Sequence, residues 1–250
     1  MKKAILLLII FLQALQVFAQ DSIDVAVPEI KNDLKFKYEA LIIPATLVGF
    51  GVIGLESETI KNINSATRNE IKEHIDEKLS LDDFSQYAPF ASVYALNAFG
   101  INGKNNFKDR TVILTTAYLI MGGTVGILKS TATVSRPDGT STNSFPSGHT
   151  ATAFMGAEFL YQEYKDVSIW YGISGYAVAT GTGFFRMYNN RHWLTDVAAG
   201  AGIGIISTKI AYWINPFIKD LLYKDKKETS GVIVPFYNGN EYGLGAVVNF

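Results

Sequence analysis

The chain has 250 residues, with 22 basic and 23 acidic side chains, 3 histidines and no cysteine. The balanced charge gives no indication of a nucleic-acid partner. The lack of cysteine excludes disulfides, thiol nucleophiles and cysteine metal sites. Charged residues are sparse, and the length suffices for one domain with a large apolar core.

The N-terminus has the pattern of an export signal. Lys2 and Lys3 precede an apolar stretch at residues 4–12, and the small-residue pattern of a cleavage site follows at 17–19. We interpret residues 1–19 as a cleaved signal peptide, with an uncleaved membrane anchor as the alternative. Either interpretation predicts an exported protein of the cell envelope.

The next hundred residues carry weaker signals. A Thr-x-x-Glu capping box at 67–70, followed by apolar residues every four positions, predicts an amphipathic helix near 68–80. His74 lies in that helix, where we expect a solvated structural role. A second start signal at 80–83 opens an uncharged stretch, and the polar segment 103–110 is expected to be a loop.

Four strongly apolar segments of helical length follow, at residues 111–128, 149–164, 167–185 and 194–218. Gly200 and Gly204 form a Gly-x-x-x-Gly pair, which lets helices approach closely. These segments predict an all-α fold, a bundle of about six helices.

Whether the bundle enters a membrane depends on span length and buried charge. A span needs about 20 mostly apolar residues, and the segments 111–128 and 167–185 come close to that. Glu158 and Lys209 interrupt the other two, and such charges are costly in lipid unless they face the bundle interior. A membrane-embedded or membrane-associated bundle is the prediction, and a soluble periplasmic bundle is the alternative.

The C-terminal tail has the pattern of β-strands instead of helices. Residues 231–236 and 242–250 are strand-like, with Asn238-Gly239-Asn240 between them as a turn. Two strands cannot close a barrel, so a β-hairpin packed on the bundle is expected. The predicted organisation is a signal peptide at 1–19, a helical domain at 20–218 and a tail at 219–250.

Three polar clusters lie at the ends of the apolar segments. Lys129 and Arg136 are separated by six residues, and Arg136 is followed by Pro137. A Pro-Ser-Gly-His run, 146–149, opens a helix. The third cluster has Arg186, His192 and Asp196, with five and then three residues between them.

These residue types suit chemistry at an anion. Asp196, four residues after His192, can fix the tautomer of the imidazole and leave its other nitrogen free to attack. His149 stands at a helix start, where backbone N–H groups form an anion site. Phosphoryl transfer is mainly positioning and charge stabilisation, and a second histidine can serve as general acid. Taken singly, each cluster has a structural explanation: a helix-start histidine, a surface ion pair, or cations at a membrane interface.

The three clusters together, in this order and spacing, resemble the signature of the type 2 phosphatidic acid phosphatase family. That signature is Lys-x6-Arg-Pro, then Pro-Ser-Gly-His, then Ser-Arg-x5-His-x3-Asp, and the match runs from Lys129 to Asp196. One position departs, because Phe185 stands where the family usually has serine. The lost hydroxyl predicts altered affinity or specificity more than lost activity.

The resemblance implies a role for each matching residue. His192 is implied as the nucleophile, Asp196 as the residue that orients it, and His149 as the general acid. The implied phosphate ligands are Lys129, Arg136, Arg186, Ser147 and the Gly148 backbone. The family needs no metal or other cofactor, and no cluster of carboxylates and histidines outside these motifs has ligand spacing.

The family includes enzymes that act on membrane lipid phosphates, soluble periplasmic acid phosphatases and vanadate-dependent haloperoxidases. The apolar, exported character favours a lipid phosphate substrate at a membrane. The stretch from Asp82 to Gly103, with Tyr87-Ala88-Pro89 and Ala95-Leu96-Asn97, is similar to lipid A 4'-phosphatases. We expect a site that faces the periplasm. A soluble acid phosphatase and a non-catalytic envelope protein are the competing hypotheses, and a haloperoxidase is disfavoured.

Overall fold

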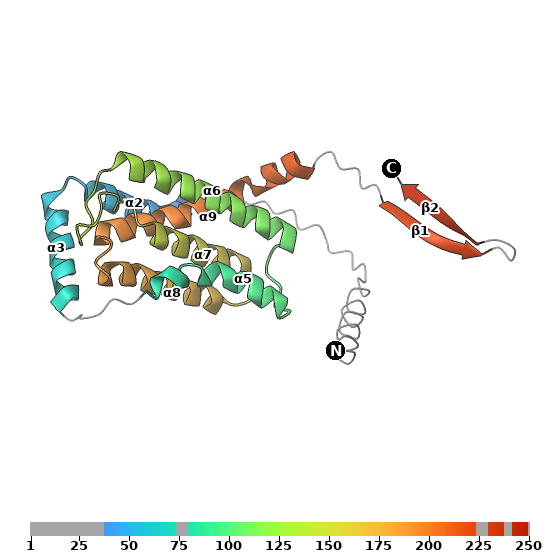
Figure 1. The fold of residues 1–250 in the computed structure, drawn as a ribbon, viewed down its shortest axis with the longest axis horizontal. Coiled ribbons are helices and arrows are strands. Elements are labelled where there is room, and N and C mark those ends of the chain that lie inside the picture. The colour runs from blue at the N-terminus through green and yellow to red at the C-terminus, as the bar shows by residue number, and fades with distance from the viewer. Residues whose placement is uncertain (1–37, 74–79, 224–229, 238–241, 250) are drawn as a thin grey trace. The chain divides into compact units, whose positions relative to one another are not determined.

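The structure, a computed structural model, describes residues 38–73, 80–223, 230–237 and 242–249. The predicted signal peptide at 1–19 and His74 lie outside the described residues. The described part of the chain is mostly helical (Figure 1), which confirms the all-α fold class. In chain order its elements are η1 (Tyr38–Leu41), α2 (Ile42–Ile53), α3 (Glu58–Glu73), α4 (Asp82–Ser85), α5 (Ala88–Ala98), α6 (Phe107–Thr131), α7 (Gly148–Tyr164), α8 (Ile169–Tyr188), α9 (Leu194–Tyr223), β1 (Ser230–Tyr237) and β2 (Tyr242–Asn249).

Helix α7 is the centre of the bundle and packs against α5, α6, α8 and α9. Its contact with α9 is close because Gly200 and Gly204 present no side chain. A Cβ on Gly200 would collide with the Ser147 carbonyl oxygen, and one on Gly204 with that of Ala151. The close approach predicted from the Gly-x-x-x-Gly pair is therefore confirmed. It brings the first turn of α7 beside the first turn of α9, where the Ser147 N–H donates to the Asp196 carbonyl oxygen at 3.0 Å.

Glu158 and Lys209, the charges that interrupt two apolar segments, bind each other inside the bundle. Lys209 Nζ donates to Glu158 Oε1 at 2.7 Å, and the Tyr176 hydroxyl donates to Glu158 Oε2. Glu158 is 2% exposed. A buried charge is tolerated in apolar surroundings when it is paired and hydrogen-bonded, so this network lets α7, α8 and α9 pack together with their charges inward.

Among the residues that the structure describes, two helices, α6 and α9, are long and apolar enough to cross a membrane. Helices α2 and α3 would add a third crossing if this pair, bent by 97°, counts as one span. Two segments were expected to approach the length of a membrane span. The one in α6 is long and apolar enough to cross a membrane, whereas the one in α8 is not. The fold is that of a helical membrane protein.

The structure corrects three helix boundaries. Helix α3 begins at Glu58, so the Thr-x-x-Glu pattern at 67–70 lies in its interior and the predicted start at 68 is wrong. Such a pattern caps a helix only where the chain before it is not helical. Helix α6 begins inside the predicted loop 103–110, because the Asn106 side chain caps it by accepting a hydrogen bond from the Asp109 N–H at 2.9 Å. Helix α9 continues past 218 to Tyr223.

The uncharged stretch after residue 83 forms two helices, α4 and α5, so the described residues contain eight α-helices instead of about six. Near the C-terminus, β1 and β2 pair antiparallel, from Ser230 opposite Asn249 to Tyr237 opposite Tyr242. The packing of a hairpin on the bundle stays a prediction, as do the domain boundaries at 19 and 218.

Candidate functional site

Four segments distant in sequence surround one cavity of about 320 Å³: α4, the loop after α6, the start of α7 and the end of α8 with the turn that follows it. Its described lining is polar and mostly charged. The lining residues are Ser80, Asp82, Asp83, Arg136, His149, Arg186, Asn189 and Arg191. Three arginines and one histidine against two carboxylates give a site suited to an anion.

His192 lies in the turn before α9 and is 3% exposed. Its Nδ1 is 3.5 Å from Asp196 Oδ2 and 3.4 Å from the Ser144 hydroxyl oxygen. Ser144 donates its own proton to Asp196 Oδ2 at 2.5 Å, so its oxygen accepts from Nδ1–H of the histidine. This hydrogen bonding assigns the proton to Nδ1 and leaves the Nε2 lone pair free.

The pKa of His192 is lowered to about 4. Burial is the main cause and outweighs the opposing effect of the Asp196 carboxylate. The imidazole is therefore neutral at neutral pH, as a nitrogen nucleophile must be. Asp196 is itself held by the Trp193 N–H, which donates to Oδ2 at 2.8 Å.

The two arginines of the sequence motifs have buried nitrogen atoms without a partner. Arg136 Nε and Arg186 Nε are both buried and make no hydrogen bond. A buried donor left unsatisfied costs about 1–3 kcal/mol, and a bound phosphate oxygen could accept from either arginine. Lys129 lies at the end of α6 and donates to the Asn143 carbonyl oxygen at 2.6 Å, outside the described lining of the cavity.

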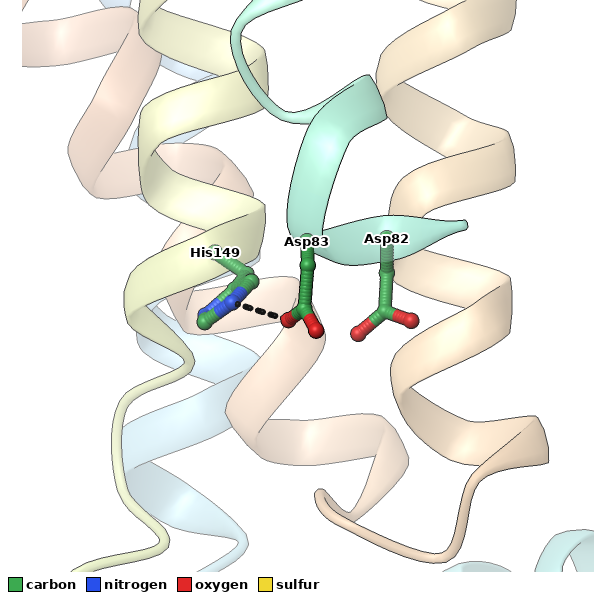
Figure 2. A group of neighbouring side chains, drawn as sticks. All are labelled: Asp82, Asp83 and His149. Carbon is green, nitrogen blue, oxygen red and sulfur yellow. Dashed lines mark hydrogen bonds and ion pairs between the residues drawn. The ribbon is translucent and has the colours of Figure 1, made fainter. Parts of the chain in front are cut away.

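Two consecutive carboxylates of α4, Asp82 and Asp83, line the cavity, and Figure 2 shows them beside His149. Asp82 accepts hydrogen bonds from Arg186 Nη1 and, at 2.9 Å, from Asn189 Nδ2. Asp83 Oδ1 lies 3.1 Å from His149 Nε2. Ligand atoms of these two aspartates and His149 fall within 4.8 Å of one another. However, Asp82 is already neutralised by Arg186, whose guanidinium opposes a cation, so the arrangement does not favour a metal ion.

The start of α7 follows the expected Pro-Ser-Gly-His pattern. The hydroxyl of Ser147 caps the helix by accepting from the Thr150 N–H at 3.4 Å, and it also contacts the Thr150 hydroxyl at 2.9 Å. Ser147 is fully buried, and its hydroxyl is used to cap the helix in this structure. Gly148 follows as the first helical residue, and His149 comes next, with its side chain 32% exposed.

Phe185, which stands where the family has serine, packs among other aromatic rings. Its ring packs edge-on against Tyr188, with centroids 5.8 Å apart, and against Phe184 at 6.0 Å. It is half-buried and absent from the described cavity lining.

Helix α3 braces the site from outside. Arg68 Nε donates to Asn190 Oδ1 at 2.8 Å, and Arg68 Nη2 donates to the Pro137 carbonyl oxygen at 3.0 Å. Its guanidinium lies 6.0 Å from the centre of the Trp193 ring. Arg68 thus ties the loop that carries Arg136 to the turn that carries His192. Asn190 holds a positive φ of 57°, which short polar side chains tolerate.

The structure brings His192 together with Asp196 and brings His149 together with Arg136 and Arg186, whereas His192 is not among the described residues that line the cavity and directly follows the lining residue Arg191. It adds residues that sequence reasoning missed: Ser144, Asp82, Asp83, Arg191 and Arg68. Ser144 had a local signal, since it stands just before the Pro-Ser-Gly-His run. The others belong to segments whose contact with the motifs depends on the packing of the bundle.

These features describe a helical membrane protein with a cavity whose charges suit an anion, lined by His149 and followed in the chain by the buried His192. Residues 110–220 match the family model described as the PAP2 superfamily, in agreement with the resemblance that the three motifs indicated. The chain is 40% identical over 146 residues to the lipid A 1-phosphatase of Porphyromonas gingivalis, covering 58% of this chain and 32% of that protein. It is 32% identical over 83 residues to the bacitracin transport permease protein BcrC of Bacillus licheniformis, covering 32% of this chain and 39% of that protein.

The chain thus spans between 32% and 39% of the length of these curated relatives. Among solved structures, LpxE of Aquifex aeolicus is 25% identical with a TM-score of 0.47, covering 60% of this chain and 95% of that one. That similarity is too low to support an argument about the site.

Proposed function

We propose that this protein is a metal-independent phosphatase that hydrolyses a phosphate monoester or pyrophosphate of an envelope lipid through a phosphohistidine intermediate. The observation that carries the proposal is the pairing of a neutral, buried His192 with a neighbouring cavity lined by His149 and two arginines. Both arginines have an unpartnered buried Nε. The function named for the Porphyromonas gingivalis relative is consistent with this substrate class.

In the first step, His192 Nε2 attacks phosphorus and forms a P–N bond. The P–O bond to the leaving group breaks, and His149 transfers a proton to the departing oxygen. Asp196 and Ser144 hold Nδ1–H, so the positive charge that develops on the imidazole lies beside a carboxylate. This arrangement stabilises the phosphohistidine.

In the second step, His149 takes a proton from water while that water attacks phosphorus. The P–N bond breaks, and inorganic phosphate leaves with the electron pair returned to Nε2. Arg136 and Arg186 stabilise the charge on the phosphoryl oxygens in both steps. We assign supporting phosphate contacts to Lys129, to the Gly148 backbone N–H and to Ser147, whose hydroxyl would have to leave its capping bond.

The test is phosphate release by the purified full chain in EDTA. The panel pairs lipid A with a phosphate at position 1 or 4', phosphatidic acid and undecaprenyl pyrophosphate with water-soluble p-nitrophenyl phosphate. We expect EDTA-resistant release, with a lipid as the best substrate. Preference for the soluble ester would favour the acid-phosphatase hypothesis, and no release from any substrate would refute the proposal.

We also propose that the site faces the periplasm. The chain has no cysteine, so Thr142→Cys, in the exposed loop after α6, introduces a single thiol. We expect a membrane-impermeant maleimide to label it in cells whose outer membrane alone is permeabilised. Labelling that requires rupture of the inner membrane would reverse the assignment.

The pH dependence follows from the two histidines. His192 must be neutral, so kcat/KM should rise as pH increases through about 4. His149 must carry a proton, and burial, aided by Arg186, lowers its pKa below the usual 6.5. Activity should therefore fall as pH rises through a value below 6.5, which places the optimum on the acid side. A pH profile corrected for ionisation of the substrate phosphate measures both limbs, and an alkaline optimum would contradict the assignment.

Loss of the Arg68 brace should impair activity more than folding. Arg68→Ala frees the two site-bearing segments from each other, and misplaced catalytic groups reduce kcat by about 10-fold to 100-fold. Arg68→Lys should not rescue it, because one ammonium lacks the guanidinium fork that reaches both oxygens. The control is Lys61→Ala on the same helix, whose side chain pairs with exposed Glu58. Equal kcat in the Arg68→Ala and Lys61→Ala variants would show that the brace has no part in catalysis.

A further inference from the structure

We propose that Asp83 is a positioning residue that holds His149 in its proton-carrying form beside the phosphate site. The inference rests on the proposed function for the role of His149 and adds a residue that no motif contains. Each histidine of the site would then have its own carboxylate: Asp196 for the nucleophile His192 and Asp83 for the general acid His149.

The geometry supports a direct ion pair. Asp83 Oδ1 lies 3.1 Å from His149 Nε2, within hydrogen-bond distance (Figure 2). The side chain of Asp83 is 57% exposed and that of His149 is 32% exposed. Both line the same cavity as Arg136 and Arg186, so the pair lies where a leaving group would receive its proton.

Helix α4, which carries Asp83, is fixed to α8 at two points. The neighbouring Asp82, 1% exposed, accepts from Arg186 Nη1 and from Asn189 Nδ2. At the other end of α4, the Ser85 and Thr182 hydroxyls are 2.7 Å apart. These contacts hold the backbone of Asp83 in place although its carboxylate reaches into the cavity.

The charges around His149 explain why it needs a carboxylate. Arg186 from α8 opposes protonation of the imidazole, and Arg136 and Arg191 add positive charge to the lining of the same cavity. Asp82 is occupied by Arg186 and compensates for that arginine. Asp83 is the other anion of the described lining, and its Oδ1 lies 3.1 Å from His149 Nε2 but 3.9 Å from Arg186 Nη1. Its hydrogen bond to His149 opposes the lowering of the His149 pKa by burial and by Arg186.

An exposed ion pair of this length would contribute little if it served only to hold α4. A structural role and a positioning role therefore predict different results. Loss of a structural contact changes stability at every pH. Loss of a carboxylate that favours the imidazolium changes the pH at which His149 loses its proton.

The experiment compares Asp83→Asn, which keeps the shape and removes the charge, with Asp83→Glu and wild type. The matched control is Asp166→Asn, the same chemical change at an exposed position beyond the opposite end of α7. Two quantities are measured on the full chain in detergent: kcat/KM against pH with p-nitrophenyl phosphate, and the pKa of His149 by NMR. The chain has 3 histidines, so the imidazole signals can be assigned by single substitutions.

We expect Asp83→Asn to move the alkaline limb and the NMR midpoint of His149 to lower pH by about one unit. That shift corresponds to about a tenfold loss of kcat/KM above the limb and little loss below it. Asp83→Glu should keep the wild-type limb, and the acid limb from His192 should not move in any variant. An unchanged His149 midpoint in Asp83→Asn would overturn the inference. If wild type releases no phosphate, the proposed function fails, and the NMR titration still decides the His149–Asp83 pairing.

Discussion

His192→Ala is expected to abolish phosphate release in EDTA, with a loss on the order of 10⁴-fold or more in kcat. The reason is that Nε2 of His192 is the atom that forms the covalent bond, and no other described side chain has the same arrangement. The buried imidazole is neutral, its Nδ1–H is held by Ser144 beside Asp196, and its remaining lone pair is free. The variant should also fail to form an acid-labile, base-stable phosphoprotein from labelled substrate in rapid-quench experiments.

The matched control for that experiment is His74→Ala, which removes a histidine outside the three motifs. We expect wild-type release and wild-type labelling from it. Because His192 is buried, thermal unfolding and circular dichroism should accompany the assay to show that the His192→Ala protein is folded. A folded His192→Ala variant with release equal to wild type would eliminate the phosphohistidine mechanism and favour a non-catalytic or differently catalysed function.

Arg186→Ala is expected to cost both activity and stability. Arg186 offers a buried, unpartnered Nε to the cavity and is paired through Nη1 with Asp82. Removal of a donor that stabilises transition-state charge lowers kcat by about 10²–10³-fold. The same change leaves the 1% exposed Asp82 without its counter-charge, and the loss of one partner of a buried ion pair costs about 3–5 kcal/mol.

The double variant Asp82→Ala, Arg186→Ala separates the two effects. Removal of both charges should restore a large part of the stability, because no uncompensated buried charge remains. It should not restore activity, since the phosphate still lacks its ligand. Arg191→Ala is the control: its pair with Asp138 is 36% exposed on the arginine side, so we expect a stability change below about 1 kcal/mol. Chemical denaturation measures stability, and an Arg186→Ala variant as stable and active as wild type would contradict both arguments.

The fold class and the main site residues could be predicted from sequence because their determinants are local. Apolar runs of helical length predicted α6 to α9 to within a few residues, since burial of an apolar helix face depends on nearby composition. His192 and Asp196 are only four residues apart, so the turn before α9 and the first residues of that helix bring them into contact, although His192 itself precedes the helix start at Leu194. Gly200 and Gly204 predicted a close helix pair for the same reason.

The tertiary structure alone decided which residues complete the site. Asp82 is 104 positions from its partner Arg186, and Asp83 is 66 positions from its partner His149. No local pattern distinguishes these two aspartates from carboxylates that cap a short helix. Arg68 reaches the site only because α3 turns by 97° from α2. In the sequence, Glu158 and Lys209 are charges that make burial of their helices costly. The packing of α7 against α9 pairs the two charges with each other and so removes much of that cost. The physical reason is that helix formation is determined over one or two turns, whereas charge pairing depends on where the packed helices place side chains distant in sequence.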